Sequence, residues 1–157
     1  MPALKKKRNI HEYISGYVDG EGCFSVSFSK RDKFLVGWET KPSFSVSQNE
    51  DRAKTLFLLQ EEFKCGFMRR DFSDKTLKYE VRSLEDLIKH VIPHFEKYPM
   101  VSTKQTDFES FKQICFLMQK GLHKEKKGLR KIMDLAFSMN PSGKRKYTKA
   151  EMQKALR

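Results

Sequence analysis

The stretch Ile14-Ser15-Gly16-Tyr17-Val18-Asp19-Gly20-Glu21-Gly22 is the most informative part of this 157-residue chain. It combines an apolar helical turn with two acids set among three glycines. Gly16 and Gly20 are four residues apart and therefore share one face of a helix. Because they lack Cβ atoms, another backbone can approach that face closely. With Asp19 and Glu21 beside it, the pattern predicts two helices that meet and hold a cation. The alternative is a helix that stops at a glycine-rich turn with solvated acids.

Helix and strand signals surround this stretch on both sides. Asn9, followed three residues later by Glu12, is typical of a helix N-cap, so a helix should run from there to about residues 20–22. From Phe24 onwards the apolar residues alternate with polar ones, and the same alternation returns over residues 38–47. Such alternation predicts a sheet that packs on one face and is open on the other.

The remainder of the chain continues the same alternation of helix and strand patterns. Ser83 is a candidate N-cap, Pro93 should end the helix that follows it, and residues 140–143 should end the last helix. The motif at 14–22 occurs once, and the sequence contains no internal repeat. The predicted elements are a helix over 51–63, strands over 67–72 and 77–82, and helices over 84–92, 103–120 and 126–139.

The motif, in the spelling GxxDGEG, and this order of elements resemble the LAGLIDADG homing endonucleases from about Asn9 to Asn140. The resemblance implies an α+β fold of αββαββα order with extra C-terminal helices, whose antiparallel sheet forms a DNA-binding saddle. Relatives with one motif act as homodimers, so a homodimer is expected here. Its interface residues are expected to be Ile14, Ser15, Gly16, Asp19 and Gly20.

The resemblance also implies a metal site at the end of the motif. Glu21 holds the position of the family's metal ligand, and Gly20 lies next to it. Two acidic helix ends that meet would repel one another without cations, because each helix C-terminus already carries partial negative charge. Mg²⁺ binds carboxylate and phosphate oxygens and suits such a site. We expect Mg²⁺ or Mn²⁺ as cofactor, with Ca²⁺ as a non-catalytic substitute.

Three further residues match or replace catalytic positions of the family. Gln48 and Arg52 have the spacing of a pair that orders water near the scissile phosphate in single-motif relatives. For Arg52, an ordinary exposed cation on a helix is the alternative. Ser102 stands where some relatives carry a catalytic lysine, so Lys104 is the expected substitute, and Lys97 could also reach.

The net charge of +12 indicates a polyanionic partner. Residues 1–10 carry four basic residues and no acid, and residues 120–157 carry twelve basic and three acidic residues. We interpret 1–157 as one domain with a basic N-terminal arm (1–9) and a basic C-terminal tail (141–157). Solubilising tails are the alternative. The polar strand positions and the tail are the expected double-stranded DNA contacts: Ser25, Ser27, Ser29, Arg31, Glu39, Lys41, Ser43, Ser45, Arg69, Asp71, Lys78, Glu80, Arg82, Lys144, Arg145 and Lys146.

The expected function is that of an intron-encoded, site-specific DNA homing endonuclease. It would make metal-dependent double-strand breaks with 3′ overhangs in a long, near-palindromic site. The alternatives are an RNA maturase of the same fold that assists intron splicing, and a non-catalytic nucleic-acid-binding regulator. The presence of Glu21 favours the nuclease.

Other features of the sequence exclude several classes of protein. Three scattered cysteines without metal spacing predict reduced thiols in an intracellular protein, in a bacterial cytoplasm or an organelle. His90 and His94 are interpreted as a surface pair. No apolar run approaches the ~18 residues of a membrane span, so no membrane partner is expected. No small-molecule cofactor is expected either.

Overall fold

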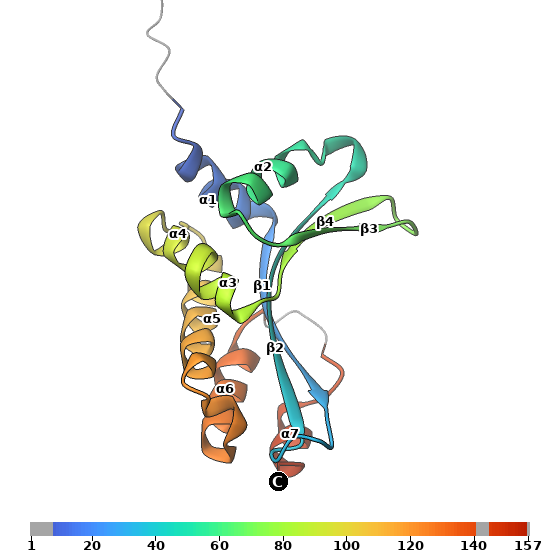
Figure 1. Ribbon diagram of the computed structural model, residues 1–157, viewed down its shortest axis with the longest axis vertical. Coiled ribbons are helices and arrows are strands. Elements are labelled where there is room, and N and C mark those ends of the chain that lie inside the picture. Colours follow the sequence, from blue (N-terminus) through green and yellow to red (C-terminus); the bar gives the residue numbers. More distant parts are fainter. Residues whose placement is uncertain (1–7, 141–144, 157) are drawn as a thin grey trace, which may run out of the picture.

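The computed structural model of the protein describes residues 8–140 and 145–156. A four-stranded antiparallel sheet forms its centre, with the strands in the order β1-β2-β4-β3. The long β1–β2 hairpin runs down the molecule, and the shorter β3–β4 hairpin lies beside its upper part (Figure 1). The strands are β1 (Gly22–Lys30), β2 (Trp38–Asn49), β3 (Phe67–Asp71) and β4 (Thr76–Val81).

The helices cover one face of this sheet and its upper end. α5 and α6 lie along one side of the β1–β2 hairpin, while α1 and α2 lie near its upper end (Figure 1). The predicted order of helices and strands from residue 10 to residue 138 is confirmed. The helical segments are α1 (Ile10–Glu21), η1 (Glu50–Arg52), α2 (Lys54–Phe63), α3 (Leu84–Asp86), η2 (Leu87–Val91), α4 (Ile92–Lys97), α5 (Lys104–Gln119), η3 (Leu122–Lys124), α6 (Lys126–Ser138) and α7 (Lys149–Lys154).

The apolar core lies between the helices and one face of the sheet, here called the inner face. Phe24 of β1 is almost fully buried, and its ring lies 5.2 Å from the Phe44 ring and 5.4 Å from the rings of Phe95 and Phe108. Aromatic rings at these distances pack favourably and bury much apolar surface. The alternation of apolar residues in β1 and β2 therefore decides which face of the sheet the helices cover.

The proline within β2 is tolerated because the sheet is staggered. Pro42 lies opposite Val26 of β1, and the carbonyl of Val26 points to the outer edge of β1, where Arg145 donates to it. Pro42 and Val26 are therefore a non-hydrogen-bonded pair, and the Pro42 nitrogen points away from β1. On that side β4 has already ended, since its last residue, Val81, pairs with Phe44. No ladder hydrogen bond is lost.

Two parts of the chain differ from the sequence-based prediction. Pro93 does not end the helix over 84–92, because the helical path continues to Lys97 through a π-helical turn at Leu87–Val91. At this turn the Ile92 N–H bonds to the Leu87 carbonyl five residues earlier, and the widened helix accommodates a proline that has no N–H to donate. Residues 145–156 are not a simple tail, since they contain α7 with Met152 buried. No helix within residues 8–140 and 145–156 is long and apolar enough to cross a membrane.

Candidate functional site

The motif helix α1 has a buried face and an exposed face. Ile14 and Val18 are fully buried within this subunit, and the buried hydroxyl of Ser15 donates to the carbonyl oxygen of Tyr98 at 2.5 Å. Gly16 and Gly20 lie on the exposed face, and a Cβ atom added to either would meet nothing within 4 Å. Only this glycine face is open to a second helix backbone.

The predicted interface set therefore needs correction at Ile14 and Ser15. Successive helix residues point about 100° apart, so Ile14 and Ser15 face away from the Gly16–Gly20 stripe. Tyr13, one turn before Gly16, is half-exposed and extends the glycine face instead. The signal that distinguishes the two faces was the i, i+3, i+7 spacing of Tyr13, Gly16 and Gly20.

Asp19 ties the end of α1 to the segment before α5. Its carboxylate accepts hydrogen bonds from the backbone N–H groups of Val101 at 3.1 Å and Ser102 at 3.0 Å, and from the Ser102 hydroxyl. Partial burial acts to raise the pKa of Asp19, but these hydrogen bonds outweigh it and lower the pKa. Asp19 therefore makes a contact within the subunit, to the position where Ser102 stands, and its interface role stays a prediction.

Lys104 holds the C-terminal end of α1. Its ammonium donates to the carbonyl oxygens of Val18, at 3.2 Å, and Gly22. A cation at this place offsets the partial negative charge of the helix C-terminus. The structure therefore brings Lys104 to the predicted site, because the two carbonyl oxygens belong to residues on either side of Glu21 in the chain. Lys97 instead lies over the ring of Tyr98, 5.6 Å from its centroid.

Glu21, Gln48 and Tyr17 form the centre of the candidate site. Glu21 is exposed, and its carboxylate has no hydrogen bond or ion pair with any residue in the described part of the chain. Burial raises the pKa of the Tyr17 phenol; a hydrogen bond with Gln48 opposes that rise, and the charge of Glu21 adds to it. Gln48 is half-buried near the end of β2, and Arg52 is exposed in η1.

Tyr17 is a further candidate residue of the site that sequence reasoning missed. Tyr17 belongs to the apolar turn of the motif, but its phenol lies beside Gln48 and Thr55. Tyr17 and Glu21 are four residues apart, and side chains with this spacing are neighbours on a helix. That spacing was the available signal.

The described residues contain no group of three or more His, Cys, Asp or Glu side chains that could hold a metal ion. Glu21 supplies one unpaired, exposed carboxylate at the end of the glycine face. A carboxylate of this kind is a suitable ligand for Mg²⁺ or Ca²⁺, which both take oxygen ligands. Within the described residues this is a single carboxylate and not a set of ligands.

The structure brings the predicted strand residues together on one face, here called the polar face. Directly paired residues share a face of the sheet, and the ladder pairs Ser25 with Ser43, Ser27 with Lys41, and Arg69 with Lys78. This face is hollowed into a groove of about 680 Å³. The lining of that groove includes Ser25, Ser27, Glu39, Lys41, Ser43, Ser45, Lys78, Glu80 and Arg82.

Acids on the polar face position its cations. Glu39 accepts from Arg31 at 2.9 Å and lies 3.9 Å from the Lys41 ammonium, and the bond with Arg31 lowers the pKa of Glu39. Glu80, only 4% exposed, pairs in the same way with Arg82 at 2.6 Å and Arg69 at 4.0 Å. Each carboxylate serves two cations, so both clusters keep a net positive charge.

Other members of the predicted set have different surroundings. Ser29 lies on the polar face opposite Glu39. The carboxylate of Asp71 accepts from Ser73 within its own turn, which lowers the pKa of Asp71. Such a local turn contact suffices to explain an aspartate at this position.

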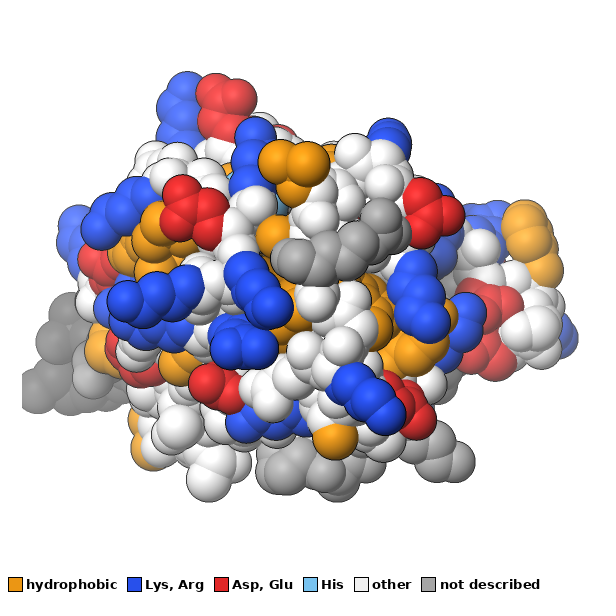
Figure 2. All heavy atoms as spheres, turned by 90° about the horizontal axis from the view of Figure 1, so that it is seen from below, with side chains coloured by type: hydrophobic (Ala, Val, Ile, Leu, Met, Phe, Trp, Pro, Cys, Tyr) orange, Lys and Arg blue, Asp and Glu red, His pale blue; other side chains and the backbone are white. Residues whose placement is uncertain are grey.

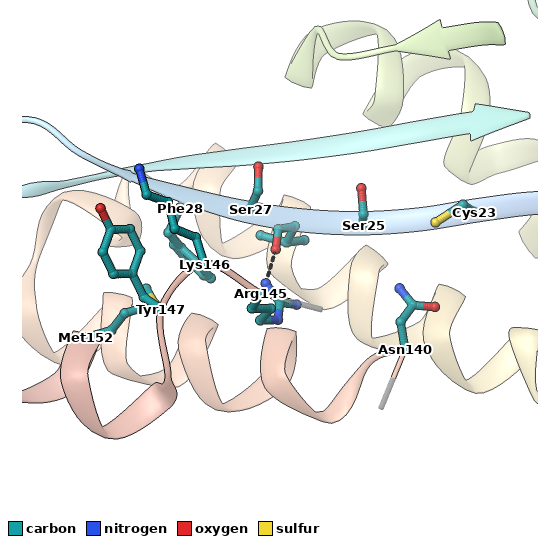
Figure 3. Close-up of a pocket in the computed structure, with 10 residues that line it drawn as sticks. Cys23, Ser25, Ser27, Phe28, Asn140, Arg145, Lys146, Tyr147 and Met152 are labelled. Carbon is teal, nitrogen blue, oxygen red and sulfur yellow. Dashed lines mark hydrogen bonds between the residues drawn. The ribbon is translucent and has the colours of Figure 1, made fainter. Parts of the chain in front are cut away.

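The predicted phosphate contacts of the C-terminal tail are only partly retained. Lys144 lies outside the described residues. Arg145 donates to the carbonyl oxygens of Val26 at 2.6 Å and Ala136 at 2.8 Å, so its guanidinium is engaged by the protein backbone. Asn140 donates to Phe24 at 2.7 Å. Figure 3 shows Asn140 and Arg145 beside β1. Both residues cover the edge of the sheet, which would otherwise expose unpaired backbone groups.

Basic side chains are distributed over the lower end of the molecule. Seen from below, Lys and Arg side chains outnumber acidic ones across this end (Figure 2). α6 contributes four exposed cations on its outer side: Lys126, Lys127, Arg130 and Lys131.

The three cysteines of the chain are free thiols. His94 is not part of a surface pair, since its ring packs 5.2 Å from the Phe63 ring and its Nε2 lies 3.1 Å from the Ser15 hydroxyl.

Comparisons with known proteins agree with this geometry. Residues 14–115 match the family model described as LAGLIDADG endonuclease. The chain is 33% identical over 129 residues to the probable intron-encoded endonuclease 2 of Neurospora crassa, covering 82% of this chain and 28% of that protein. The chain spans about a quarter of the length of the first curated relatives that it matches.

Two solved structures are similar over almost the whole chain. The homing endonuclease I-TnaI is 30% identical with a TM-score of 0.80, covering 92% of this chain and 94% of that one. I-SmaMI bound to its uncleaved DNA target in the presence of calcium ions is 31% identical with a TM-score of 0.84. That match covers 95% of this chain and 49% of I-SmaMI.

Proposed function

This chain belongs to the LAGLIDADG endonuclease family, and from that membership we propose that it is a homing endonuclease that cuts both strands of DNA as a homodimer. The observation that carries the proposal is the exposed glycine face of α1, which ends in the unpaired carboxylate of Glu21. A binding module would need the polar face but would have no use for this carboxylate. The RNA maturase and the regulator are therefore disfavoured.

The second subunit is needed because one chain holds one such carboxylate. Two copies of α1 packed through Gly16 and Gly20 would bring two Glu21 residues and two helix C-termini together. Their mutual repulsion favours divalent cations at the contact. I-TnaI, a homing endonuclease, is matched over 94% of its chain by this single-motif chain, which supports a dimer of equal subunits.

Glu21 would hold the metal ion, with Gly20 beside it. A divalent ion there would supply charge neutralisation at a phosphodiester and lower the pKa of bound water. The calcium-containing DNA complex of I-SmaMI supports the use of a divalent ion; within that class we propose Mg²⁺ or Mn²⁺ as the active ion and Ca²⁺ as a substitute that permits binding alone.

The other residues of the site would act around this ion. Gln48 can orient water, and Arg52 can interact with a phosphate from η1. Lys104 already binds two carbonyl oxygens of the α1 end; we assign it as a positioning residue that keeps Glu21 in place. The polar face would contact base edges in the major groove, where its hydroxyls can donate or accept hydrogen bonds and its cations can donate them.

An intron origin and an intracellular location, organellar or bacterial, are part of the proposal because several relatives are intron-encoded.

Glu21→Gln tests the proposed function. The change keeps the shape of the side chain and removes the charge that would bind the metal, so cleavage should fall by about 100-fold or more while DNA binding persists. The substrate is a plasmid that carries the joined sequences flanking the reading frame in its natural gene. Cleavage is measured in Mg²⁺, and binding by gel shift in Ca²⁺.

Glu12→Gln is the matched control, because Glu12 is an exposed acid in the first turn of the same helix. It should cut like the wild type. Normal double-strand cutting by Glu21→Gln would refute the assignment of the active site.

A further inference from the structure

A small cleft at the far end of β1 lies outside the candidate site around Glu21. It opens between the last residue of β1 and the segment that leads into α7, and its volume is about 390 Å³. The cleft is lined by Lys30, Trp38, Lys146, Tyr147 and Glu151. Two cations and two aromatic rings thus meet at the edge of the sheet, at the end opposite to α1.

Tyr147 is held in a fixed position by the core beneath it. Its ring lies 5.1 Å from the ring of Trp38 in an edge-to-face arrangement, with an interplanar angle of 79°. Trp38 is only 3% exposed, and Tyr147 is itself half-buried against the core. Edge-to-face aromatic pairs are favourable and directional. The Tyr147 ring is therefore a fixed platform on the surface.

Two lysines from distant parts of the chain converge on this ring. The Lys30 ammonium lies 5.1 Å and the Lys146 ammonium 5.5 Å from the centroid of the Tyr147 ring. Both distances are within the range of cation–π attraction. Lys30 comes from the end of β1, whereas Lys146 comes from the segment after Arg145; Figure 3 shows Lys146 extending from that segment toward β1.

The two ammonium groups lack a carboxylate partner within residues 8–140 and 145–156. Glu151 lines the same cleft, but its Oε2 accepts from the backbone N–H of Thr148 at 2.9 Å and closes the capping box of α7. Two like charges held at one ring repel each other. An anion between them would remove that repulsion.

We propose that Lys30 and Lys146, held on Tyr147, clamp one phosphodiester of the DNA backbone at the edge of the sheet. The proposal rests on the proposed DNA-binding function and extends it to a site that sets register rather than sequence. Lysine ammonium groups act on phosphate as point charges, and the cleft offers no planar amide or guanidinium to recognise a base edge. The segment after Arg145 thus contributes to DNA binding through Lys146, positioned by an aromatic ring.

The test is binding to a fluorescent 30-base-pair duplex of arbitrary sequence, measured by anisotropy over a range of salt concentrations. Each phosphate contact adds about 0.9 to the slope of log affinity against log salt. Because both lysines share one phosphate, Lys30→Met combined with Lys146→Met should lower the slope by about one unit in total. Tyr147→Leu leaves the charge unchanged but should weaken binding by about two- to fivefold, the size of an exposed cation–π contact.

Two variants serve as matched controls. Tyr147→Phe keeps the ring and should bind like the wild type. Lys154→Met removes an exposed charge from α7 outside the cleft and should change the slope little. Thermal unfolding of Tyr147→Leu checks that the fold is intact. Tyr147→Phe combined with both lysine changes repeats the measurement of the salt slope with an aromatic ring still present.

The outcomes separate the two proposals. A loss of two units of slope in the double lysine variant would indicate independent contacts and overturn the clamp. Unchanged binding by Tyr147→Leu would also overturn it. A wild-type protein with no salt-dependent affinity for the duplex would refute DNA binding itself, and the clamp with it.

Discussion

His94 connects the motif helix to the rest of the subunit. Its Nε2 lies 3.1 Å from the Ser15 hydroxyl of α1, and its ring packs against Phe95 and Tyr98 at centroid distances of 4.8 and 5.4 Å. Burial, followed by the charge of His11, lowers the pKa of His94 to about 4. The folded state therefore favours the neutral imidazole of His94 over the protonated one.

Stability should fall in acid because of this residue. An unfolded histidine has a pKa of about 6.5, so below that pH the unfolded chain binds a proton that the folded chain does not. The contribution of His94 is fully present above about pH 6.5 and is lost as the pH falls toward about 4. Because the ring is partly exposed, solvent reduces this effect, and we expect the free energy of unfolding to fall by about 1 kcal/mol between pH 7 and pH 5.

Thermal unfolding at these two pH values measures the effect. His94→Gln, which keeps a hydrogen-bonding group for Ser15, should lower stability at pH 7 but reduce its dependence on pH. His90→Gln, one helical turn earlier, is the control and should keep the wild-type dependence. An unchanged pH dependence in His94→Gln would show that other groups cause the acid effect.

The two faces of α1 have different tasks at the scale of the element. One face carries Ile14, Ser15 and Val18 into the core, and the other presents Gly16 and Gly20 to solvent. Gly22 differs from both glycines, since a Cβ there would lie 2.6 Å from Val18 Cγ1 and 2.8 Å from the Val18 carbonyl oxygen. The same residue type thus leaves an open helix face at two positions and permits close packing within the subunit at the third.

Gly16→Leu should prevent dimer formation without harming the subunit. The added side chain has free space in the single chain, but it would separate two helices whose backbones meet at that face. Sedimentation velocity should show a monomer with a melting temperature close to that of the wild type. Gly22→Ala is the opposite control and should destabilise the subunit by about 1–3 kcal/mol through overpacking. Wild-type association by Gly16→Leu would place the interface elsewhere.

At the scale of the whole molecule, the positive charge is spread over surfaces other than the polar face. α6 packs its buried residues, Leu129, Ile132, Met133 and Ala136, toward the sheet. Its exposed cations therefore point away from the sheet, while the polar face lies on the other side. Charges farther than a Debye length, about 8 Å at physiological ionic strength, are largely screened.

Neutralising α6 should therefore cost less affinity than neutralising the polar face. Lys126, Lys127, Arg130 and Lys131 changed together to Gln remove four charges but should leave the salt slope for duplex DNA nearly unchanged. Lys41→Met combined with Lys78→Met removes two charges and should lower the slope by up to about two units. Anisotropy measurements on one duplex compare the two variants directly. A larger loss from the α6 variant would move the DNA to the helical side.

Local patterns in the sequence were sufficient for the elements and for the motif. The Asn9 cap, the alternation from Phe24 to Phe28 and the apolar spacing in α6 each depend on residues within one or two turns, where backbone geometry fixes which side chains are neighbours. The glycine face was identified for the same reason, whereas Glu21 was singled out by the resemblance of the motif to the family. The capping-box pair Thr148 and Glu151 was an equally local signal for α7 and was overlooked.

Tertiary structure alone decided which side chains surround these elements. Asp19 binds Ser102 across 83 positions, Lys104 binds Gly22 across 82, and Arg145 binds Val26 across 119. Periodicity says that a residue faces the core or the solvent, but not which distant segment it will meet there. That choice depends on the packing of whole elements against one another. For this reason the sequence determined the family, the fold and the acid at the end of the motif helix, while the contacts of Ser15, Asp19, Lys104 and Arg145 became apparent only in the folded chain.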